Sequence, residues 1–279
     1  MSSAPAPYNL EVADNCLNCR FRSEGHFCNF ATPVLQALSA VSYISIYPEG
    51  AVLFVEGQEP HGVYFLCRGR AKLSMVSAEG KSLILRITEA GELLDPSASL
   101  LGQPHTVTVE TLAPSQVNFV RREDFLRFLR SWPEAMFRMV QHVSREYQSA
   151  CREINSLGLT HSATAKMAKL LLGWQDARLN AGGLSTIKLT LTHEEMAQMI
   201  GATRETVTRI LARFRNRDYI EIHGATLFIR NRSALQSIAD NRSDLRPLRF
   251  ATGRDSVCMS DSSRTSVETV ENGTRALRG

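Results

Sequence analysis

The stretch that decides the fold, Thr192–Arg217, reads THEEMAQMIGATRETVTRILARFRNR. Its spacing predicts two short helices joined at Gly201, because glycine supplies the backbone freedom that a tight turn between helices needs. Thr192 and Glu195 fit a capping box at the start of the first helix, and Thr203 fits an N-cap of the second. The stretch therefore predicts a helix-turn-helix.

The second of these helices has an apolar face and a basic face. Its apolar residues recur at i, i+3, i+4 and i+7, which predicts a buried face made by Val207, Ile210, Leu211 and Phe214. Five arginines and a single acid fall between residues 204 and 217, and this excess predicts contacts with the phosphates and bases of DNA. The candidate DNA-contacting residues are Arg204, Glu205, Thr208, Arg209, Arg213 and Arg215. A helix pair with a purely structural role is the alternative.

The segments on either side extend this stretch to a small domain. Residues 162–180 have helical spacing, and residues 187–191 alternate like a short strand. Residues 219–222 and 226–229 predict a β-hairpin, and a helix-turn-helix followed by a hairpin is a winged helix. From about residue 240 the chain is rich in Ser, Arg, Asp and Thr, which predicts a disordered tail because such a segment buries too little apolar surface.

Residues 44–125 have a different character from the C-terminal part. They contain short β-prone segments separated by glycine turns, such as Glu56-Gly57 and Arg68-Gly69. Regular short strands with such turns predict an antiparallel sandwich or jelly roll. Residues 34–43 predict a short helix ahead of it. The predicted fold class is therefore α+β, with an N-terminal antiparallel β-roll, a long helix and a C-terminal winged helix-turn-helix.

Residues 123–157 predict a helical region with one apolar seam. The seam residues alternate steps of four and three over three heptads and have polar neighbours, which favours pairing with a second copy of the chain. They are Met136, Val140, Val143, Tyr147, Ala150, Ile154 and Leu157. The prediction is a homodimer, and the alternative is a single amphipathic helix packed on its own domain.

Three of the six cysteines, Cys16, Cys19 and Cys28, fall within 13 residues near the N-terminus. A CxxC turn points two sulfurs to one side, and soft thiolates suit a metal ion or an iron–sulfur cluster. His26 is a candidate further ligand. The alternatives are unligated thiols on a loop and a redox dithiol at Cys16 and Cys19. The remaining cysteines are expected to be structural or unligated: Cys67 as a buried strand residue, Cys151 beside the seam and Cys258 in the tail.

The bulk properties narrow the class of protein. The chain has 279 residues and a net charge of +4, which is mildly basic. No apolar run approaches the roughly 20 residues of a membrane span, and no signal peptide is recognised at the N-terminus. We expect a cytoplasmic protein that binds no membrane. The sequence has no partnering His–Asp pattern, phosphate loop or dinucleotide motif, so we expect no enzyme activity and no catalytic residues.

The segment PEGAVLFVEGQEPHGVYFLCRGRAKL at residues 48–73 resembles the first half of a cyclic-nucleotide-binding-type β-roll. In nucleotide-binding members a Gly–Glu pair meets the ribose, which places the implied ligand pocket at Gly91, Glu92, His105 and Thr106. His105 stands where those members have an arginine, and a neutral histidine lacks the permanent two-pronged anion clamp of arginine. Cyclic AMP is therefore not the expected ligand, and Glu92 is expected to be a turn residue.

Roll, long helix and winged helix in this order resemble the Crp/Fnr family of bacterial transcription regulators over roughly residues 16–238. The segment Ala202-Thr-Arg-Glu-Thr-Val-Thr-Arg-Ile210 carries most of the resemblance. It implies a palindromic site with TGTGA-type halves, where Arg204 and Arg209 contact guanines and Glu205 contacts a cytosine. It also implies RNA polymerase as a partner. This helix is closer to the cyclic-AMP branch of the family.

The N-terminal cysteines resemble those of the oxygen-sensing branch instead. Its members hold an iron–sulfur cluster with three N-terminal cysteines and one cysteine from the roll, which implies Cys16, Cys19 and Cys28 as ligands here. The C-x2-C-x8-C spacing has a longer second gap than the family form, and Ser115 stands where the fourth cysteine falls. Serine is a poor cluster ligand, so the fourth ligand stays unidentified, with Cys67 and His26 as substitutes. Zinc or no ligand are the alternatives.

These expectations divide the chain into a cysteine-containing segment (1–30), a β-roll sensor domain (31–130), a dimerisation helix (131–158), a winged helix-turn-helix (159–238) and a disordered tail (239–279). The predicted function is a homodimeric regulator in which a signal at the N-terminal half shifts the dimer helices on double-stranded DNA. The same regulator controlled by a small ligand in the roll is an alternative. Two others are a thiol or metal redox enzyme, and a nucleotide-responsive module whose basic helix binds a protein.

Overall fold

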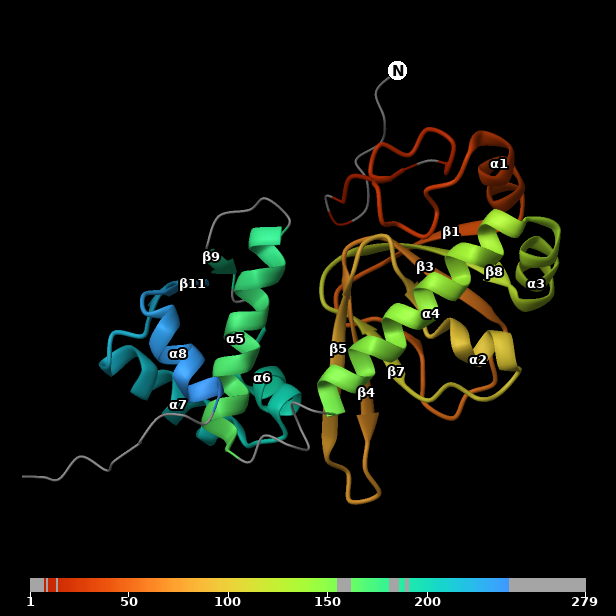
Figure 1. Ribbon diagram of the computed structural model, residues 1–279. Helices are drawn as coiled ribbons and strands as arrows, with labels where there is room; N and C mark the ends of the chain where they lie inside the picture. The colour runs from red at the N-terminus through yellow and green to blue at the C-terminus, as the bar shows by residue number, and fades with distance from the viewer. Residues whose placement is uncertain are drawn as a thin grey trace, which may run out of the picture. The chain divides into compact units, whose positions relative to one another are not determined.

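The computed structural model describes residues 8, 10–13, 15–154, 162–180, 186–188 and 191–240 (Figure 1). Leu157 of the predicted seam, Cys258 and nearly all of the predicted tail lie outside these residues. Among the described helices, none is long and apolar enough to cross a membrane. The predicted α+β class is confirmed, with antiparallel sheets in the N-terminal part and a helix-turn-helix in the C-terminal part.

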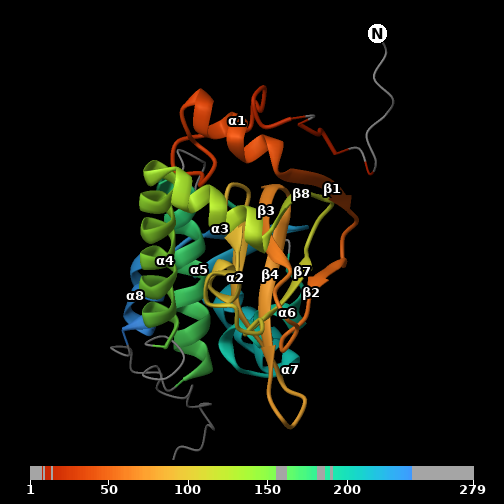
Figure 2. The same cartoon turned by 90° about the vertical axis from the view of Figure 1, so that its right-hand side faces the viewer.

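The N-terminal part is a roll of two antiparallel four-stranded sheets, which Figure 2 shows from the side. One sheet has the order β1-β8-β3-β6, with the bounds Ser42–Tyr47, Ser115–Arg121, Gly62–Arg68 and Leu93–Leu94. The other has the order β2-β7-β4-β5, with the bounds Val52–Phe54, Thr108–Thr111, Arg70–Val76 and Ser82–Glu89. The short helix α2, Pro96–Leu101, follows β6 and was not predicted.

Strand β3 is covered on both faces, because successive side chains of a strand point to opposite sides. Leu66 is fully buried between the two sheets, where it packs with Phe54, Leu73 and Val117. Phe65 points the other way, into an apolar cluster with residues of α1 (Thr32–Ala40), α3 (Arg122–Ser131) and α4 (Pro133–Ile154). The three helices are therefore held against the β3 side of the roll.

The predicted helix over residues 123–157 is wrong at one point, because the chain breaks between α3 and α4. Trp132 has an extended backbone, with φ −127° and ψ 96°, and Pro133 begins α4. A residue before proline is driven out of the helical region by contact with the proline ring, and proline suits the first turn of the next helix. The helix predicted over residues 34–43 is α1, which begins earlier, at Thr32, and ends at Ala40, because β1 starts at Ser42.

The C-terminal part is a winged helix-turn-helix. Its helices α5 (Ala163–Asn180), α6 (His193–Ile200), α7 (Arg204–Asn216) and α8 (Arg232–Ala239) share one apolar core. Strands β10 (Ile220–His223) and β11 (Thr226–Ile229) form the predicted hairpin, and β9 (Thr186–Lys188) pairs with β11 as a third strand. Helix α8 was not predicted, and its buried Leu235 and Ile238 complete this core.

Candidate nucleic-acid interface and cysteine pocket

Helix α6 begins with the predicted capping box. The Thr192 hydroxyl accepts a hydrogen bond from the backbone N–H of Glu195 (3.1 Å), and the Glu195 carboxylate accepts one from the backbone N–H of Thr192 (2.9 Å). The helix ends at Gly201, whose φ of +64° is a left-handed conformation that glycine adopts without strain. These local interactions determine where the turn falls and where α7 begins.

Helix α7 is oriented by its buried face. Thr203 caps it by accepting a hydrogen bond from the backbone N–H of Thr206 (3.3 Å). The predicted apolar residues Val207, Ile210, Leu211 and Phe214 are all buried in the domain core. With about 100° between successive residues, the opposite half of the helix must then face solvent.

The structure brings all six predicted DNA-contacting residues onto that exposed half of α7. Arg204, Glu205, Thr208, Arg209, Arg213 and Arg215 are each exposed. Within the described residues no salt bridge engages these arginines; Arg209 only donates a long hydrogen bond to the Thr206 hydroxyl (3.4 Å). Their guanidinium groups are therefore available to an external anion or base edge.

Two oxygen-bearing side chains on the same face, Thr208 and Glu205, are held by hydrogen bonds. The Thr208 hydroxyl lies 2.9 Å from Nδ1 of His193 in α6 and donates to the Arg204 carbonyl oxygen (3.0 Å). Hydrogen bonds from its own backbone N–H and from the Thr203 side chain lower the pKa of Glu205 below its ordinary value. Glu205 is therefore a carboxylate at neutral pH and can only accept hydrogen bonds.

Helix α4 presents an apolar strip beside the side that packs on the roll, because each strip residue lies about 100° around the helix from a buried one. Ala135, Met139 and His142 are buried on the roll side. Of the predicted seam residues, Met136, Val140, Tyr147, Ala150 and Ile154 are exposed, whereas Val143 is partly covered by the roll. Phe137 and Cys151 are exposed too, although neither belongs to the predicted seam.

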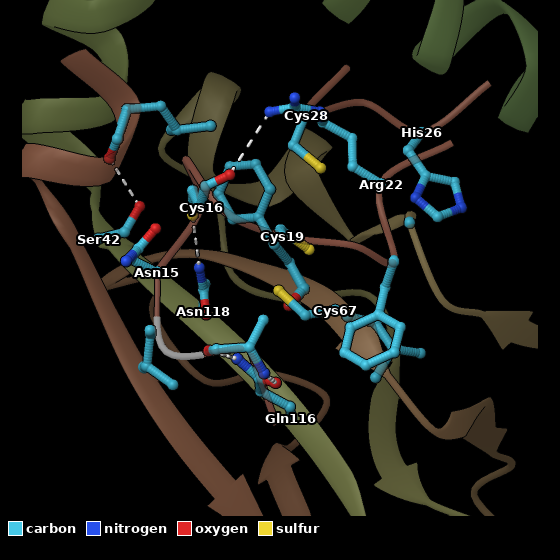
Figure 3. A pocket seen from close by; sticks show the side chains of 17 residues that line it. Asn15, Cys16, Cys19, Arg22, His26, Cys28, Ser42, Cys67, Gln116 and Asn118 are labelled. Carbon is cyan, nitrogen blue, oxygen red and sulfur yellow. Dashed lines mark hydrogen bonds between the residues drawn. The ribbon is translucent and has the colours of Figure 1, made fainter. Parts of the chain in front are cut away.

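Four cysteines line one cavity between the N-terminal segment and the roll (Figure 3). Cys16, Cys19 and Cys28 come from the N-terminal segment, and Cys67 comes from β3. The cavity holds about 40 Å³ and is otherwise lined mainly by apolar atoms. The sequence left two interpretations of Cys67 open, a small buried strand residue and a substitute fourth ligand, and its position beside the other three thiols agrees with the second.

Cys67 lies at an irregularity in β3. Leu66 pairs with Val117 of β8, but Arg68 pairs with Gln116, so one residue of β3 has no counterpart between them. A β-bulge of this kind redirects the side chain of the extra residue. A one-residue bulge leaves no pattern in a single sequence, which is why the position of Cys67 could not be predicted.

Two buried amides of β8 hold the N-terminal segment against the roll. Gln116 exchanges two hydrogen bonds with the backbone of Ala13, at 2.9 Å and 2.8 Å. The side-chain N–H of Asn118 donates to the sulfur of Cys16 at 3.2 Å (Figure 3). These contacts join positions about a hundred residues apart, and they place Cys16 next to β3.

Burial shifts the acidity of the pocket thiols. Loss of hydration raises the pKa of Cys16, raises that of Cys28 to about 11 and raises that of Cys67 still further. Repulsion between the thiolates of the pocket adds to each shift, while the Arg22 guanidinium lowers the pKa of Cys16 and of Cys28. Without a cation the thiols of Cys16, Cys28 and Cys67 are protonated at neutral pH. A bound metal would offset both the loss of hydration and the repulsion between the thiolates.

The other candidate ligands differ in position. His26 lines the same cavity, and its burial lowers its pKa below the ordinary value. Ser115 is fully buried and donates its hydroxyl to the Ala113 carbonyl oxygen (2.7 Å), and it does not line the cavity. Within the described part of the chain, no three Cys, His, Asp or Glu side chains converge closely enough for a single metal ion.

The structure does not bring together the four residues of the implied ligand pocket. Glu92 accepts a hydrogen bond from Arg86 (2.6 Å). His105 is buried, lies 2.9 Å from a carboxylate oxygen of Asp95 and stacks on Phe54. Gly91 and Glu92 line a polar cavity of about 320 Å³ beside α4, and neither His105 nor Thr106 belongs to its lining.

Comparison with known proteins identifies the family. Two family descriptions match: a cyclic nucleotide-binding domain over residues 45–131 and a Crp-like helix-turn-helix domain over residues 165–238. The chain belongs to the Crp/Fnr family. As a member of this family it is a DNA-binding transcription regulator, and Crp/Fnr regulators act as dimers.

Individual Crp/Fnr relatives are distant but cover most of the described chain. The cAMP-activated global transcriptional regulator CRP of Pasteurella multocida is 23% identical over 201 residues, which cover 71% of this chain and 94% of that protein. The CRP-like cAMP-activated global transcriptional regulator of Mycobacterium tuberculosis is 25% identical over 184 residues, covering 66% and 82%.

Solved structures of the Crp/Fnr family share the fold. A CooA mutant from Carboxydothermus hydrogenoformans aligns with a TM-score of 0.63 at 21% identity, covering 82% of this chain and 98% of that one. FixK2 from Bradyrhizobium japonicum aligns with a TM-score of 0.61 at 19% identity, covering 71% and 97%.

Proposed function

We propose that the chain reads a palindromic TGTGA-like site as a homodimer, with α7 as the recognition helix. Arg204 and Arg209 would contact guanines as two-pronged donors, and the Glu205 carboxylate would accept from a cytosine amino group. Thr208, Arg213 and Arg215 would contact the sugar–phosphate backbone of the DNA or neighbouring bases. The observation that carries this proposal is the exposed half of α7, on which every predicted contact residue lies and no salt bridge between described residues occupies the arginines.

The apolar strip of α4 supports the homodimer. An exposed row that contains Val140, Tyr147 and Ile154 repeats every seven residues, the interval that brings the same face of a paired helix back to its partner. Two copies would place two recognition helices in successive major grooves, roughly 34 Å apart. The domain boundaries of the sequence analysis, a cytoplasmic location and contact with RNA polymerase are part of the same proposal.

Replacement of Arg209 by alanine tests the DNA-reading role. Specific binding should weaken by roughly 10- to 100-fold, the usual value of one two-pronged guanine contact, while non-specific binding falls much less. Gel shifts on a TGTGA palindrome and on a scrambled duplex measure both quantities. Arg217→Ala, at the C-cap of the same helix, is the matched control. Full sequence preference in the Arg209 variant would rule out this recognition mode.

We further infer that Cys16, Cys19, Cys28 and Cys67 hold an iron–sulfur cluster, with Cys67 as the fourth ligand. Four thiolates are the usual ligand set of such a cluster, and each of them can bind a different iron. Thiols arranged around a cavity, rather than converging on one point, suit several metal atoms better than one. When bound, the cluster supplies oxidation chemistry that responds to oxygen or nitric oxide. The protein residues position the thiolates and exclude water.

Replacement of Cys67 by serine tests the fourth ligand. Anaerobically purified wild-type protein should contain iron and acid-labile sulfide in equal amounts with a visible absorption band, and the Cys67→Ser variant should lose most of each. Cys151→Ser removes an exposed thiol outside the cavity and should change nothing. A wild-type protein without iron and sulfide would refute the cluster, and an unchanged cluster in Cys67→Ser would refute the fourth ligand.

A regulator controlled by a small ligand is the second candidate, and the polar cavity beside α4 favours it. Arg86, Glu92, His142 and Arg145 line this cavity together with His26. The relatives described above are named cAMP-activated, but here Arg86 occupies the Glu92 carboxylate and Asp95 engages His105. We infer that cyclic AMP does not bind in the family manner. Calorimetry with cyclic AMP tests this, and saturable binding would contradict it.

A further inference from the structure

The turn at residues 90–92 is hydrogen-bonded to the segment that carries Cys28 and to β3, which carries Cys67. The backbone N–H of Phe27 donates to the Gly91 carbonyl oxygen (3.1 Å), and Cys28 is the next residue along the chain. On the other side, Gly91 donates to the Leu66 carbonyl oxygen (2.7 Å) and Leu66 donates to the Glu92 carbonyl oxygen (2.9 Å). Cys67 follows Leu66. A movement of either cysteine therefore pulls directly on this turn.

Gly91 also touches the cysteine loop through its missing side chain. A Cβ atom at this position would lie 2.1 Å from the ring of His26, so the ring packs directly against the backbone of the turn. The φ of Gly91 is +96°, which a residue with a side chain rarely adopts. The loop that carries His26 and Cys28 is therefore in direct contact with the backbone of the turn.

Arg86, in β5, connects the turn to α4. One terminal nitrogen donates to Glu92 of the turn (2.6 Å), and the other donates to Glu146 of α4 (2.8 Å). The side chains of Arg86 and Glu146 are only 20% and 21% exposed, so water competes weakly for these bonds. His142, one helical turn earlier, lies 3.5 Å from the same oxygen of Glu146. The planar guanidinium fixes the directions of both bonds, which makes the connection stiff.

We propose that Arg86 is a positioning residue through which the state of the cysteine pocket sets the placement of α4. This rests on the proposed cluster in that pocket and on the proposed homodimer through α4. A change at Cys28 or Cys67 moves the turn, the turn carries Glu92, and Arg86 carries the displacement to Glu146. Without the guanidinium, two partly buried carboxylates would face the same space and repel each other, so the turn and α4 would no longer move together.

The test compares three full-length proteins: the wild type, Arg86→Gln and Arg127→Gln. Arg127 is the matched control because it also pairs with a carboxylate, that of Asp124 (2.9 Å), but both residues lie in α3. Each protein is prepared reduced and metal-free, and then with Cd²⁺ as a thiolate-binding probe. Thiol titration counts the cysteines that Cd²⁺ protects, and amide hydrogen exchange follows residues 139–149 of α4.

Loading with Cd²⁺ is expected to change exchange in α4 by roughly fivefold or more in the wild type and in Arg127→Gln, the lower end of typical coupling between sites. In Arg86→Gln the change should stay within the cysteine loop, β3 and the turn. An equal response of α4 in Arg86→Gln overturns the proposal. A wild-type α4 that ignores Cd²⁺, although the thiols are protected, overturns it too.

A second perturbation keeps the test independent of metal binding. If Cd²⁺ protects no thiols, Gly91→Ala is introduced into Arg86→Gln and Arg127→Gln, and the proposed cluster is judged separately by its iron and sulfide content. The new methyl group must displace the His26 ring, so exchange in α4 should change in the Arg127→Gln background only. An equal change in both backgrounds overturns the role of Arg86. Wild-type exchange rates in β1, β8 and α5–α8 of metal-free Arg86→Gln show that the variant is folded.

Discussion

The recognition helix and the cysteine pocket are assembled in opposite ways. Helix α7 takes its caps, its buried face and its basic face from consecutive residues, 203 to 217. The pocket takes its thiols from Cys16, Cys19, Cys28 and Cys67, and it depends on Gln116 and Asn118 to hold the first of them in place. The proposed reading function is therefore local in sequence, whereas the proposed sensing function depends on contacts across a hundred residues.

The two regions also differ in the exposure of their ionisable groups. The arginines of α7 are exposed and can bind an anion, so their charge state depends little on the rest of the chain. Cys16, Cys28 and Cys67 are partly buried near one another, and the pKa values of these three thiols are raised as a result. A change in the pocket therefore alters the energy of the fold around it, which is the property that a sensor needs.

The largest effect should come from breaking the buried face of α7. Phe214 is 1% exposed, and Phe214→Ala should cost about 3–5 kcal/mol, because a cavity remains where the ring was. Chemical denaturation followed by hydrogen exchange of α5–α8 measures this cost. Arg215→Ala, the next residue on the exposed face, should change stability by less than about 0.5 kcal/mol. Equal losses in the two variants would contradict the assignment of faces.

A smaller effect should appear in the pocket as the pH rises. Because the folded pKa of Cys28 is about 11 against an ordinary value of 9.0, the metal-free unfolded chain loses this proton first. Stability should therefore be complete below pH 9 and fall between pH 9 and pH 11, by at most about 2.7 kcal/mol at 1.36 kcal/mol per unit. Urea denaturation of wild type and Cys28→Ser checks this. Identical pH profiles would show that the thiol is not held in its protonated form.

The smallest of these effects should come from the capping box. Thr192→Ala removes the hydroxyl that accepts from Glu195 and should cost about 1 kcal/mol. Thr192→Ser keeps the hydroxyl and should restore most of the loss. Thermal unfolding of the two variants measures the difference. No difference between them would mean that packing, rather than the cap, determines where α6 begins.

Residue patterns predicted those parts of the fold that depend on residues close together in the sequence. The capping box at Thr192, the turn at Gly201 and the four buried residues of α7 follow from spacing within 26 residues, and the structure contains each of them. The break at Trp132 was not predicted, although Pro133 could have indicated it from the sequence alone. Helix α8 was not predicted, since it is short and gains its stability from packing in the core of the C-terminal domain. The short strand predicted at residues 187–191 overlaps β9, Thr186–Lys188, which pairs with β11.

The sequence by itself determined the helix-turn-helix, its basic face and the antiparallel roll, because helix periodicity, caps and glycine turns act over a few residues. Only the tertiary structure decided that Cys67 joins Cys16, Cys19 and Cys28, that Ser115 does not, and that Glu92 binds Arg86. Those choices depend on a bulge in β3, two amides on β8 and the packing of α4 on the roll. Contacts between distant segments form only when the whole chain is folded, so no local pattern specifies them.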